Sequence, residues 1–325
     1  MHEIHVNVNH ALPAVVDALL EGGEREDSRN GPVISVPEPF ILSTLCPEER
    51  VLLCPVRRAN PFLFLIDGLS ILTDFNSVAL FTKFAKRFAD CSDDGIRFHG
   101  HYGERLAPQI PKALEMLTSD PTTRRVHLTI WDAAKDLGTK TKDVPCNIGV
   151  IPRIVNRPMP LEDNTEVQAR FLDLTVLNRS NDLFWGMLGA NIVQFSFLQE
   201  YMAGCLGAQI GTLHQVSMNL HAYTDFGPGT VLPKKDTDVW ENPFTVPEEG
   251  SYPPVFPMDV TNIRKELKSL FIDIANEDTP DGFKNSFINE VVIPMLRSWK
   301  DKSSEPLKDH PDCDWFQAAR LWWGK

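Results

Sequence analysis

Two residue types that could do chemistry together stand at Cys146 and Arg179. Residues 143–147 read DVPCN and residues 178–182 read NRSND. A thiolate is a strong nucleophile, and the planar guanidinium of arginine binds phosphate through two parallel hydrogen bonds. A free cysteine is mostly protonated at neutral pH, so the positive charge of Arg179 is expected to lower the pKa of Cys146. The pair predicts a thiolate that attacks an electron-poor ring whose phosphate is held by arginine.

Composition limits the kind of protein that carries this pair. The chain has 325 residues, of which 42% are hydrophobic and 23% charged, as in a soluble globular protein. The net charge of −12 argues against a broad surface that binds nucleic acid. A few arginines focused in one pocket remain compatible with this negative charge. No apolar run of about 18 residues predicts a membrane span, and residues 1–5 do not begin a secretory signal. These features predict a cytoplasmic protein that binds neither membrane nor nucleic acid.

The cysteines give no sign of a metal site. None of the six forms a Cys-x-x-Cys pair, and no histidine spacing beside them fits a zinc pattern. In the cytosol they are expected to be reduced, and any single one is most simply a small buried hydrophobic residue. We therefore predict no metal and no disulfide.

Hydrophobic periodicity predicts the elements that must position these residues. Helices are expected at residues 12–21, 61–72, 77–89, 109–118, 192–206, about 260–275, 282–299 and in a last short segment ending near 323. Strands are expected at residues 33–36, 40–45, 125–131, 147–154, 166–178 and 218–223. Residues 26–32 are rich in turn formers and predict a loop that carries Arg29. The pattern predicts one α+β domain that continues through a proline-rich segment into a helical C-terminal extension.

The order of these motifs resembles the thymidylate synthase family, which includes the pyrimidine nucleotide hydroxymethylases. The resemblance covers roughly residues 12–225 and is dense from 120 to 223. It implies a mixed β-sheet packed with helices and a homodimer formed through that sheet. It also implies a catalytic domain over residues 1–225, with residues 226–325 as a proline-rich loop and helical extension of the same domain.

The resemblance assigns the substrate-binding residues of a pyrimidine nucleoside monophosphate. Arg29 matches the N-terminal phosphate loop, while Arg124 and Arg125 match a pair that reaches the phosphate of the other subunit. Further matches are Arg179 and Ser180 at the phosphate, Asn191 at the pyrimidine edge, and His221 and Tyr223 at the sugar. Asn191 stands one residue further from Arg179 than the family's usual spacing.

The resemblance also assigns the residues that act on the ring. Cys146 is the nucleophile, accompanied by Asp67, by Tyr102 of a Tyr-Gly turn and by Asn147. Asp182 is the match for a residue that contacts folate, which implies 5,10-methylene-tetrahydrofolate as co-substrate and no metal. Addition of the thiolate to carbon 6 of the ring makes carbon 5 nucleophilic, and the folate supplies the carbon unit.

Each of these residues also has a plainer interpretation. Arg124 and Arg125 at a strand start are usually solvated, and Asp182 could cap a helix. His221 could be a structural histidine, and Asn191 in an apolar stretch more often bonds neighbouring backbone. Their occurrence together in the family's order favours the shared nucleotide site over these interpretations taken as a set.

Three departures from the family concern the reaction outcome. Residues 67–70 read DGLS where the family has Glu-x-x-Trp, Asn147 stands where synthases have histidine, and a long extension replaces a short C-terminal tail. A shorter acid and a missing tryptophan would leave space for water at the carbon transferred to the ring.

The departures therefore predict a hydroxymethylase of the kind used by phages and antibiotic pathways, acting in the host cytoplasm if phage-encoded. Asn191 can donate and accept, which favours uracil and thus dUMP. A methylating synthase, a dCMP or CMP hydroxymethylase or methyltransferase, and an inactive nucleotide- or RNA-binding relative remain alternatives.

Overall fold

A six-stranded mixed sheet forms the centre of the protein in the computed structural model, which describes residues 1–324 except 162–164, 226, 235–236, 241–251 and 279. The strand order is β1-β4-β9-β7-β6-β5, and the pairs β1–β4 and β7–β9 are parallel. The strands are β1 (His2–His5), β4 (Phe40–Thr44), β9 (Gln209–Ser217), β7 (Glu166–Asn178), β6 (Asn147–Pro160) and β5 (Leu128–Thr129). The predicted α+β class is confirmed.

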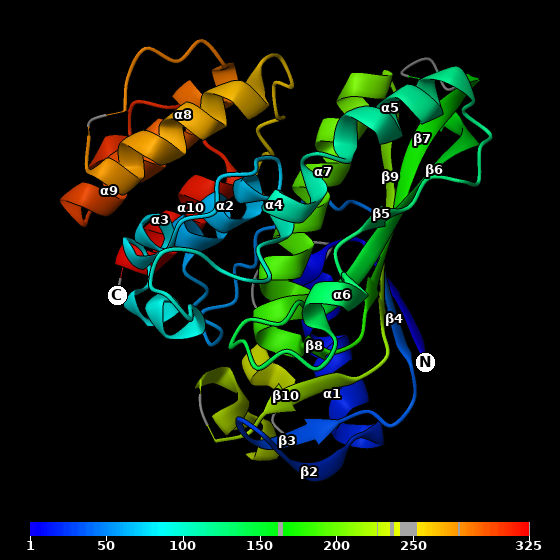
Figure 1. Cartoon of the computed structure of the whole chain (residues 1–325), viewed down its shortest axis with the longest axis vertical. Helices are drawn as coiled ribbons and strands as arrows, with labels where there is room; N and C mark the ends of the chain where they lie inside the picture. The colour runs from blue at the N-terminus through cyan, green and yellow to red at the C-terminus, as the bar shows by residue number, and fades with distance from the viewer. Residues whose placement is uncertain (162–164, 226, 235–236, 241–251, 279, 325) are drawn as a thin grey trace.

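The two faces of this sheet differ in what covers them. On β7, Leu172, Leu174 and Val176 are fully buried under helix α7 (Asn191–Leu206), whereas the residues between them are half-buried. Figure 1 shows α7 and the other helices on one side of the sheet, and the described chain places no helix on the other. Ile151 on that open side is 39% exposed. This face also carries polar groups, among them the ion pair of Arg157 with Asp173. A sheet face left open in this way is available for contact with a second subunit.

A second sheet of four strands lies at one end of the first (Figure 1). Its order is β2 (Glu24–Ser28), β3 (Gly31–Ser35), β10 (Leu220–Tyr223) and β8 (Asn181–Asp182). The prediction of a loop over residues 26–32 is wrong at both ends, because β2 and β3 pair as a tight hairpin. Gly31 makes the turn possible with a φ of 122°, which residues with a side chain rarely adopt. Arg29 therefore lies at the tip of a hairpin.

The N-terminal helices are α1 (Val8–Gly22), α2 (Pro61–Ser70), α3 (Val78–Thr82), α4 (Tyr102–Leu106), α5 (Ile110–Ser119) and α6 (Ala133–Asp136). Of these, α1, α2 and α5 lie where helices were predicted, although α1 begins at Val8, and the short α4 and α6 were not predicted. The predicted helix over 77–89 is wrong, since α3 ends at Thr82 and a 3-10 helix follows at Lys86–Cys91. The break brings the rings of Phe81 and Phe88 into a stack at 5.5 Å, so tertiary packing overrides local propensity.

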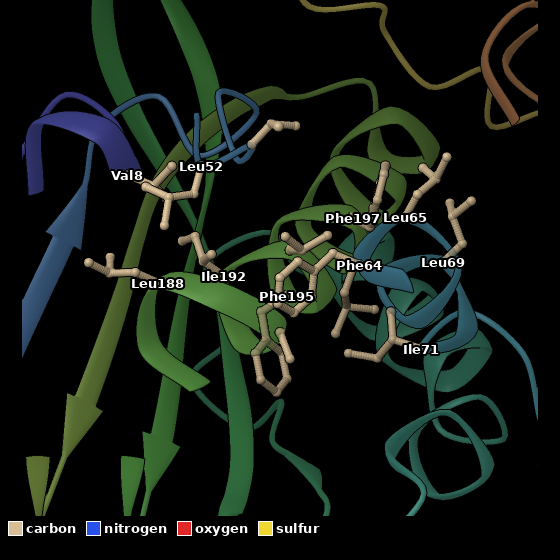
Figure 2. Close-up of a cluster of buried hydrophobic side chains, with 14 of the residues drawn as sticks. Val8, Leu52, Phe64, Leu65, Leu69, Ile71, Leu188, Ile192, Phe195 and Phe197 are labelled. Carbon is tan, nitrogen blue, oxygen red and sulfur yellow. The ribbon is translucent and has the colours of Figure 1, made fainter. Parts of the chain in front are cut away.

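Helix α2 approaches α7 closely at Gly68. A Cβ at this position would lie 2.5 Å from Cγ1 of Val193 and 2.9 Å from Cδ2 of Phe197, so a larger residue would push the helices apart. Figure 2 shows the hydrophobic cluster around this contact, to which α2 contributes Phe64 and Leu69 and α7 contributes Phe197. The contact fixes Asp67 of α2 against α7.

Two strand predictions need correction. The predicted strand over 125–131 is wrong for most of its length, because only Leu128 and Thr129 pair with β6. Strand β9 was not predicted at all. Its sequence alternates, but Gln215 and Ser217 occupy the buried face and are fully enclosed, which hides the usual pattern of apolar residues inside. Sequence periodicity fails where a sheet buries polar side chains that find partners.

The C-terminal extension packs on the rest of the chain. It contains α8 (Ile263–Asn276), α9 (Ile293–Asp301) and α10 (Asp314–Trp323), and a π-helical turn at Ile288–Val292 precedes α9. The rings of Trp299 and Trp323 lie 5.2 and 5.5 Å from that of Phe62 in α2. Helix α2 therefore shares its core with the extension. Across the described ranges, no helix is long and apolar enough to cross a membrane.

Candidate active site

Cys146 lies immediately before β6, and Arg179 lies immediately after the paired strand β7. The backbone N–H of Arg179 donates to the carbonyl of Cys146 at 2.9 Å. The guanidinium donates to the carbonyls of Pro145 at 2.9 Å and Val144 at 3.1 Å, and its Nη2 lies 3.8 Å from Sγ of Cys146. Trp131 supports the guanidinium, with its ring centroid 5.6 Å away. The structure therefore brings together the two residues that the motifs pair.

The thiol of Cys146 is nevertheless not activated within one chain. Burial raises its pKa above the ordinary value, and the charges of Asp143 and Asp182 raise it further. Arg179 and Arg29 act in the opposite direction but do not outweigh burial. Arg179 lowers the pKa of Cys146 as expected, but burial outweighs its charge, and the sequence does not show how deeply the thiol is enclosed. More positive charge is needed to generate the thiolate.

Tyr102 begins α4 and faces the nucleophile. Burial raises the pKa of its hydroxyl well above 10, and negative charge on Cys146 and Asp143 adds to this, whereas backbone hydrogen bonds from Asn147 and Cys146 oppose it. The phenol is thus neutral and lies close to the Cys146 backbone. Its ring stacks on Phe195 of α7 with centroids 6.2 Å apart, which fixes its direction.

Asn147 lies behind the nucleophile and is fully buried. Its amide nitrogen donates to the side-chain carbonyl of Asn178 across the β6–β7 pair. Its Oδ1 has no hydrogen-bond partner among the described residues. A buried acceptor without a partner is costly, so this atom is available to a donor that enters the site.

Asp67 is buried in α2 at 8% exposure. Burial raises the pKa of its carboxyl to about 7, a hydrogen bond from Gln194 opposes the rise, and the charge of Asp143 adds to it. A carboxyl with this pKa can exchange a proton near neutral pH. Ser70, one turn later, is also buried and donates to the Asp67 carbonyl at 2.7 Å. Ser70 is thus bonded within its own helix, and the expectation that the missing tryptophan leaves space for water stays a prediction.

Asn191 begins α7 after an unusual π-helical segment at Leu183–Ala190. Its backbone is non-helical at Leu188 and Gly189, so the chain is kinked there, within the stretch between Arg179 and Asn191 that is one residue longer than the family's usual spacing. The Asn191 amide nitrogen donates to Oδ1 of Asn181 at 2.9 Å, and Asn181 in turn donates to Ser217 Oγ at 3.0 Å. This chain of hydrogen bonds fixes the direction of the Asn191 amide.

Asp182, His221 and Tyr223 meet where β8 and β10 run side by side. His221 lies opposite Asp182 in the register, and its ring meets that of Tyr223 edge to face at 5.4 Å. Asp182 accepts from the backbone N–H of Trp185, so it caps the π-helical segment as its plainer interpretation held. Burial raises the pKa of Asp182, while its hydrogen bond from Trp185 and the charges of His221 and Arg57 oppose the rise.

The remaining predicted residues lie at the surface. Arg29 is exposed, and Ser180 beside Arg179 is half-buried. Arg124 and Arg125 are exposed, and neither forms a hydrogen bond or ion pair with the part of its own chain that the structure describes. Their place in a shared site thus depends on a second subunit.

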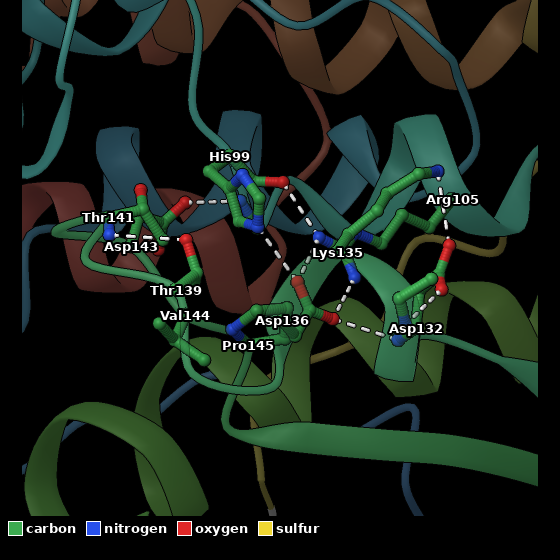
Figure 3. A network of polar contacts seen from close by, with 12 residues as sticks. His99, Arg105, Asp132, Lys135, Asp136, Thr139, Thr141, Asp143, Val144 and Pro145 are labelled. Atoms are coloured by element: carbon green, nitrogen blue, oxygen red, sulfur yellow. Dashed lines mark hydrogen bonds and ion pairs between the residues drawn. The ribbon is translucent and has the colours of Figure 1, made fainter.

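Several residues near the site were not predicted. Asp143, three residues before Cys146, accepts from the backbone N–H of Gly100 at 2.8 Å. Figure 3 shows it beside a network in which Asp136 accepts from Arg105 at 2.5 Å and contacts His99 at 2.8 Å. Burial raises the pKa of Asp136, but these hydrogen bonds outweigh it and hold the pKa well below the ordinary value. The network holds the loop that leads to Cys146.

Gln194 and Asn181 were missed for a different reason. Each is an amide within or beside an apolar stretch, where no sequence pattern separates a site residue from a structural one. Helical spacing could have indicated Gln194, since it stands three residues after Asn191 and so shares its helix face. No group of three or more potential metal ligands occurs within the described ranges.

Comparison with known proteins gives consistent matches. The family model for thymidylate synthase matches residues 83–242. A deoxyuridylate hydroxymethyltransferase of Pseudomonas phage M6 is 38% identical over 97% of this chain and 92% of its own length. One of Bacillus phage SP01 is 32% identical over 58% of this chain and 50% of its own length. A putative thymidylate synthase of Methanosarcina acetivorans is 33% identical over 39% of this chain and 54% of its own length. The chain belongs to the thymidylate synthase family.

Proposed function

We propose that this protein is a dUMP hydroxymethyltransferase that uses 5,10-methylene-tetrahydrofolate. The observation that carries the proposal is the 38% identity, over nearly the full length of both chains, with the deoxyuridylate hydroxymethyltransferase of Pseudomonas phage M6. The contact of Arg179 with Cys146 and the enclosed Asp67 supply the chemistry that such a reaction needs. Both substrates are cytoplasmic metabolites, so the reaction takes place in the cytoplasm, the host's if the gene is phage-borne.

The nucleotide phosphate is held by arginines from two subunits. Arg29, Arg179 and Ser180 come from one chain, and Arg124 and Arg125 of the partner subunit complete the set in a homodimer. The exposed side chains of that pair and the sheet face that no helix of the described chain covers support this arrangement. Because burial keeps the Cys146 pKa high, the partner's cations would also favour the thiolate.

The base and sugar are bound at the other end of the site. With its nitrogen engaged by Asn181, Asn191 presents its oxygen to the N–H of a uracil ring, and the remaining N–H can donate to the ring carbonyl. Cytosine carries an acceptor where uracil has that N–H, so the same geometry disfavours it. His221 and Tyr223 lie together on β10 and bind the sugar hydroxyl.

The residues around Asp182 suit a folate. Trp185 is 46% exposed, and its ring is tilted by 48° against that of Phe64 and by 52° against that of Phe88, so its own exposed indole is an aromatic surface for a planar ring. The Asp182 carboxylate can accept N–H groups beside it. When bound, the folate would supply the one-carbon unit.

The chain's own residues divide the remaining work. Cys146 adds to carbon 6 of the ring, which activates carbon 5, and Tyr102 and Asn147 hold the backbone that presents the thiol. Asp67 exchanges a proton with water at the new carbon substituent of the ring. The described part of residues 226–325 encloses α2 and so forms one domain with residues 1–225.

Product analysis tests the proposal. The protein is incubated with methylene-tetrahydrofolate and either dUMP or dCMP. The mass of the nucleotide product is measured by mass spectrometry, and folate oxidation is followed by absorbance. We expect dUMP to gain one hydroxymethyl group with no dihydrofolate formed. Stoichiometric dihydrofolate with methylated dUMP would show a methylating synthase instead, modified dCMP would show a cytosine enzyme, and no modified nucleotide would show an inactive relative.

A further inference from the structure

We propose that Gln194 positions the water that becomes the new hydroxyl group, and that it is a specificity-determining residue for hydroxymethylation. This inference rests on the proposed function and deepens it. The juxtaposition that carries it is an enclosed amide on α7 that lies beside the Asp67 carboxyl and has an acceptor without a partner in the described structure.

The burial of Gln194 is the first observation. The residue is 8% exposed, yet its Oε1 has no hydrogen-bond partner within the described chain. A buried amide acceptor left unsatisfied costs about 1–3 kcal/mol, so the atom gains from a donor that reaches it. Gln199, five residues later on the same helix, also has an Oε1 without a partner in the described structure, and its amide nitrogen donates to the carbonyls of Leu172 at 2.8 Å and Gly211 at 3.0 Å. The two residues differ in their surroundings, because Gln199 is bonded to the sheet whereas Gln194 lies beside the Asp67 carboxyl.

The position of Gln194 is the second observation. It stands three residues after Asn191, so both amides project from the same face of α7. The close approach at Gly68 brings Asp67 against this face, because a Cβ there would meet Val193 at 2.5 Å. The contact between α2 and α7 therefore brings together three groups: Asn191, which faces the base, the Gln194 amide and the Asp67 carboxyl.

The third observation is that a second enclosed acceptor lies next to the nucleophile. Oδ1 of Asn147, the residue after Cys146, is also without a partner in the described structure. Water can donate two hydrogen bonds, and buried water in proteins typically has about three partners. Gln194 and Asp67 provide polar groups of the kind that hold such a molecule. An apolar residue in place of Gln194 would leave the water without one of its acceptors.

Water attacks after Cys146 has added to the ring and the carbon unit has been transferred to it. The ring is bound to Cys146 through carbon 6 and carries a methylene on carbon 5. The water oxygen forms a bond to the methylene and loses a proton to the Asp67 carboxylate. The electron pair of the methylene double bond moves into the ring as an enolate, which then expels the Cys146 thiolate as the bond from carbon 6 to sulfur breaks. The product is the 5-hydroxymethyl nucleotide, with no oxidation or reduction.

Competition between water and an added thiol tests the inference. 2-Mercaptoethanol is a soft nucleophile that attacks the same methylene and gives a thioether in place of the hydroxyl. We expect Gln194→Met, which keeps the side-chain volume, to raise the ratio of thioether to hydroxymethyl product by at least about tenfold, because water loses its orientation. Exchange of the carbon 5 hydrogen, which reports Cys146 addition, should stay within about threefold of wild type.

Gln199→Met is the matched control, since it removes a buried amide from the same helix outside the site. It should leave the product ratio unchanged even if it lowers stability. An equal shift in both variants, or none in Gln194→Met, would overturn the role of Gln194 and leave the proposed function intact. Methylated product and dihydrofolate from the wild type would overturn the proposed function itself.

A pH profile provides a second readout, which also serves if Gln194→Met does not fold. The Gln194 hydrogen bond favours the charged Asp67 carboxylate and so lowers its pKa. The carboxylate form accepts the proton, so hydroxymethylation should rise with pH through about 7 in the wild type. Gln194→Glu replaces the donor with a second negative charge and should shift this rise to higher pH. An unchanged profile in Gln194→Glu would contradict the contact on which the inference rests.

Discussion

The region around Cys146 and the contact between α2 and α7 differ in the exposure and hydrogen bonding of their polar groups. Arg179 is exposed and has three of its contacts on the backbone beside Cys146, so its place is fixed before any ligand arrives. Asp67 and Gln194 are enclosed, and the latter keeps an acceptor without a partner. We propose that the first region binds an anion and that the second holds a small polar molecule. Substrate binding and reaction outcome are thus determined in different parts of one site.

Removing the nucleophile should have the largest effect, and it should separate turnover from substrate binding. Cys146→Ala should lower turnover by about 10³-fold or more, since no other group can add to carbon 6. Binding of dUMP, measured by calorimetry, should change little because the phosphate and base contacts remain. Cys91→Ala, at an exposed thiol, is the control and should keep full activity. Turnover by Cys146→Ala would remove the basis of the mechanism.

The second largest effect is expected when two inactive variants, each lacking one part of a shared phosphate site, are combined in one dimer. Arg125→Ala and Cys146→Ala are each expected to be inactive as homodimers. A heterodimer would contain one intact site, so an equal mixture with random pairing should regain about a quarter of wild-type activity. Activity is measured after the subunits are mixed under exchange conditions and pairing is verified by native mass spectrometry. Verified heterodimers without activity would show that the sites are not shared.

A smaller effect is expected at the pyrimidine edge. Asn191→Asp should change the ratio of kcat/KM for dUMP over dCMP by roughly 100-fold toward dCMP, because a carboxylate accepts from the cytosine amino group and cannot donate to uracil unless protonated. Asn181→Ser, which frees the Asn191 amide to rotate, should reduce the same ratio less. Preference of the wild-type protein for dCMP would contradict the assignment of Asn191.

The smallest effect concerns stability at the buried C-terminal contact. Asp314 is 1% exposed, and Tyr252 donates to it at 3.1 Å. Burial raises the pKa of Asp314 to about 7, with the Arg50 charge opposing. The folded state therefore holds a proton that the unfolded state releases above about pH 4, so stability should fall as pH rises from about 4 to 7, by at most about 1.4 kcal/mol per pH unit. Asp314→Asn should weaken this dependence in urea unfolding at constant protein concentration; an equal slope in both proteins would contradict it.

The sequence predicted the region around Cys146 and Arg179 better than the contact between α2 and α7. The pairing of Cys146 with Arg179 follows from motifs at the ends of two strongly periodic strands, whose pairing brings those ends together. The raised pKa of Cys146 and the role of Gln194 could not be predicted, because both depend on how deeply groups distant in the chain enclose one another. Strand β9 was missed for the same reason, since its buried glutamine and serine are satisfied only by partners from other strands and helices.

The origin of the product oxygen tests the central claim most directly. The protein is incubated with dUMP and methylene-tetrahydrofolate in water enriched in oxygen-18, and the nucleotide product is analysed by mass spectrometry. If enclosed polar groups around Asp67 deliver water to the ring substituent, the product is 5-hydroxymethyl-dUMP and its new hydroxyl carries the heavy isotope. A methylated product, or a hydroxymethyl group without the isotope, would contradict the account.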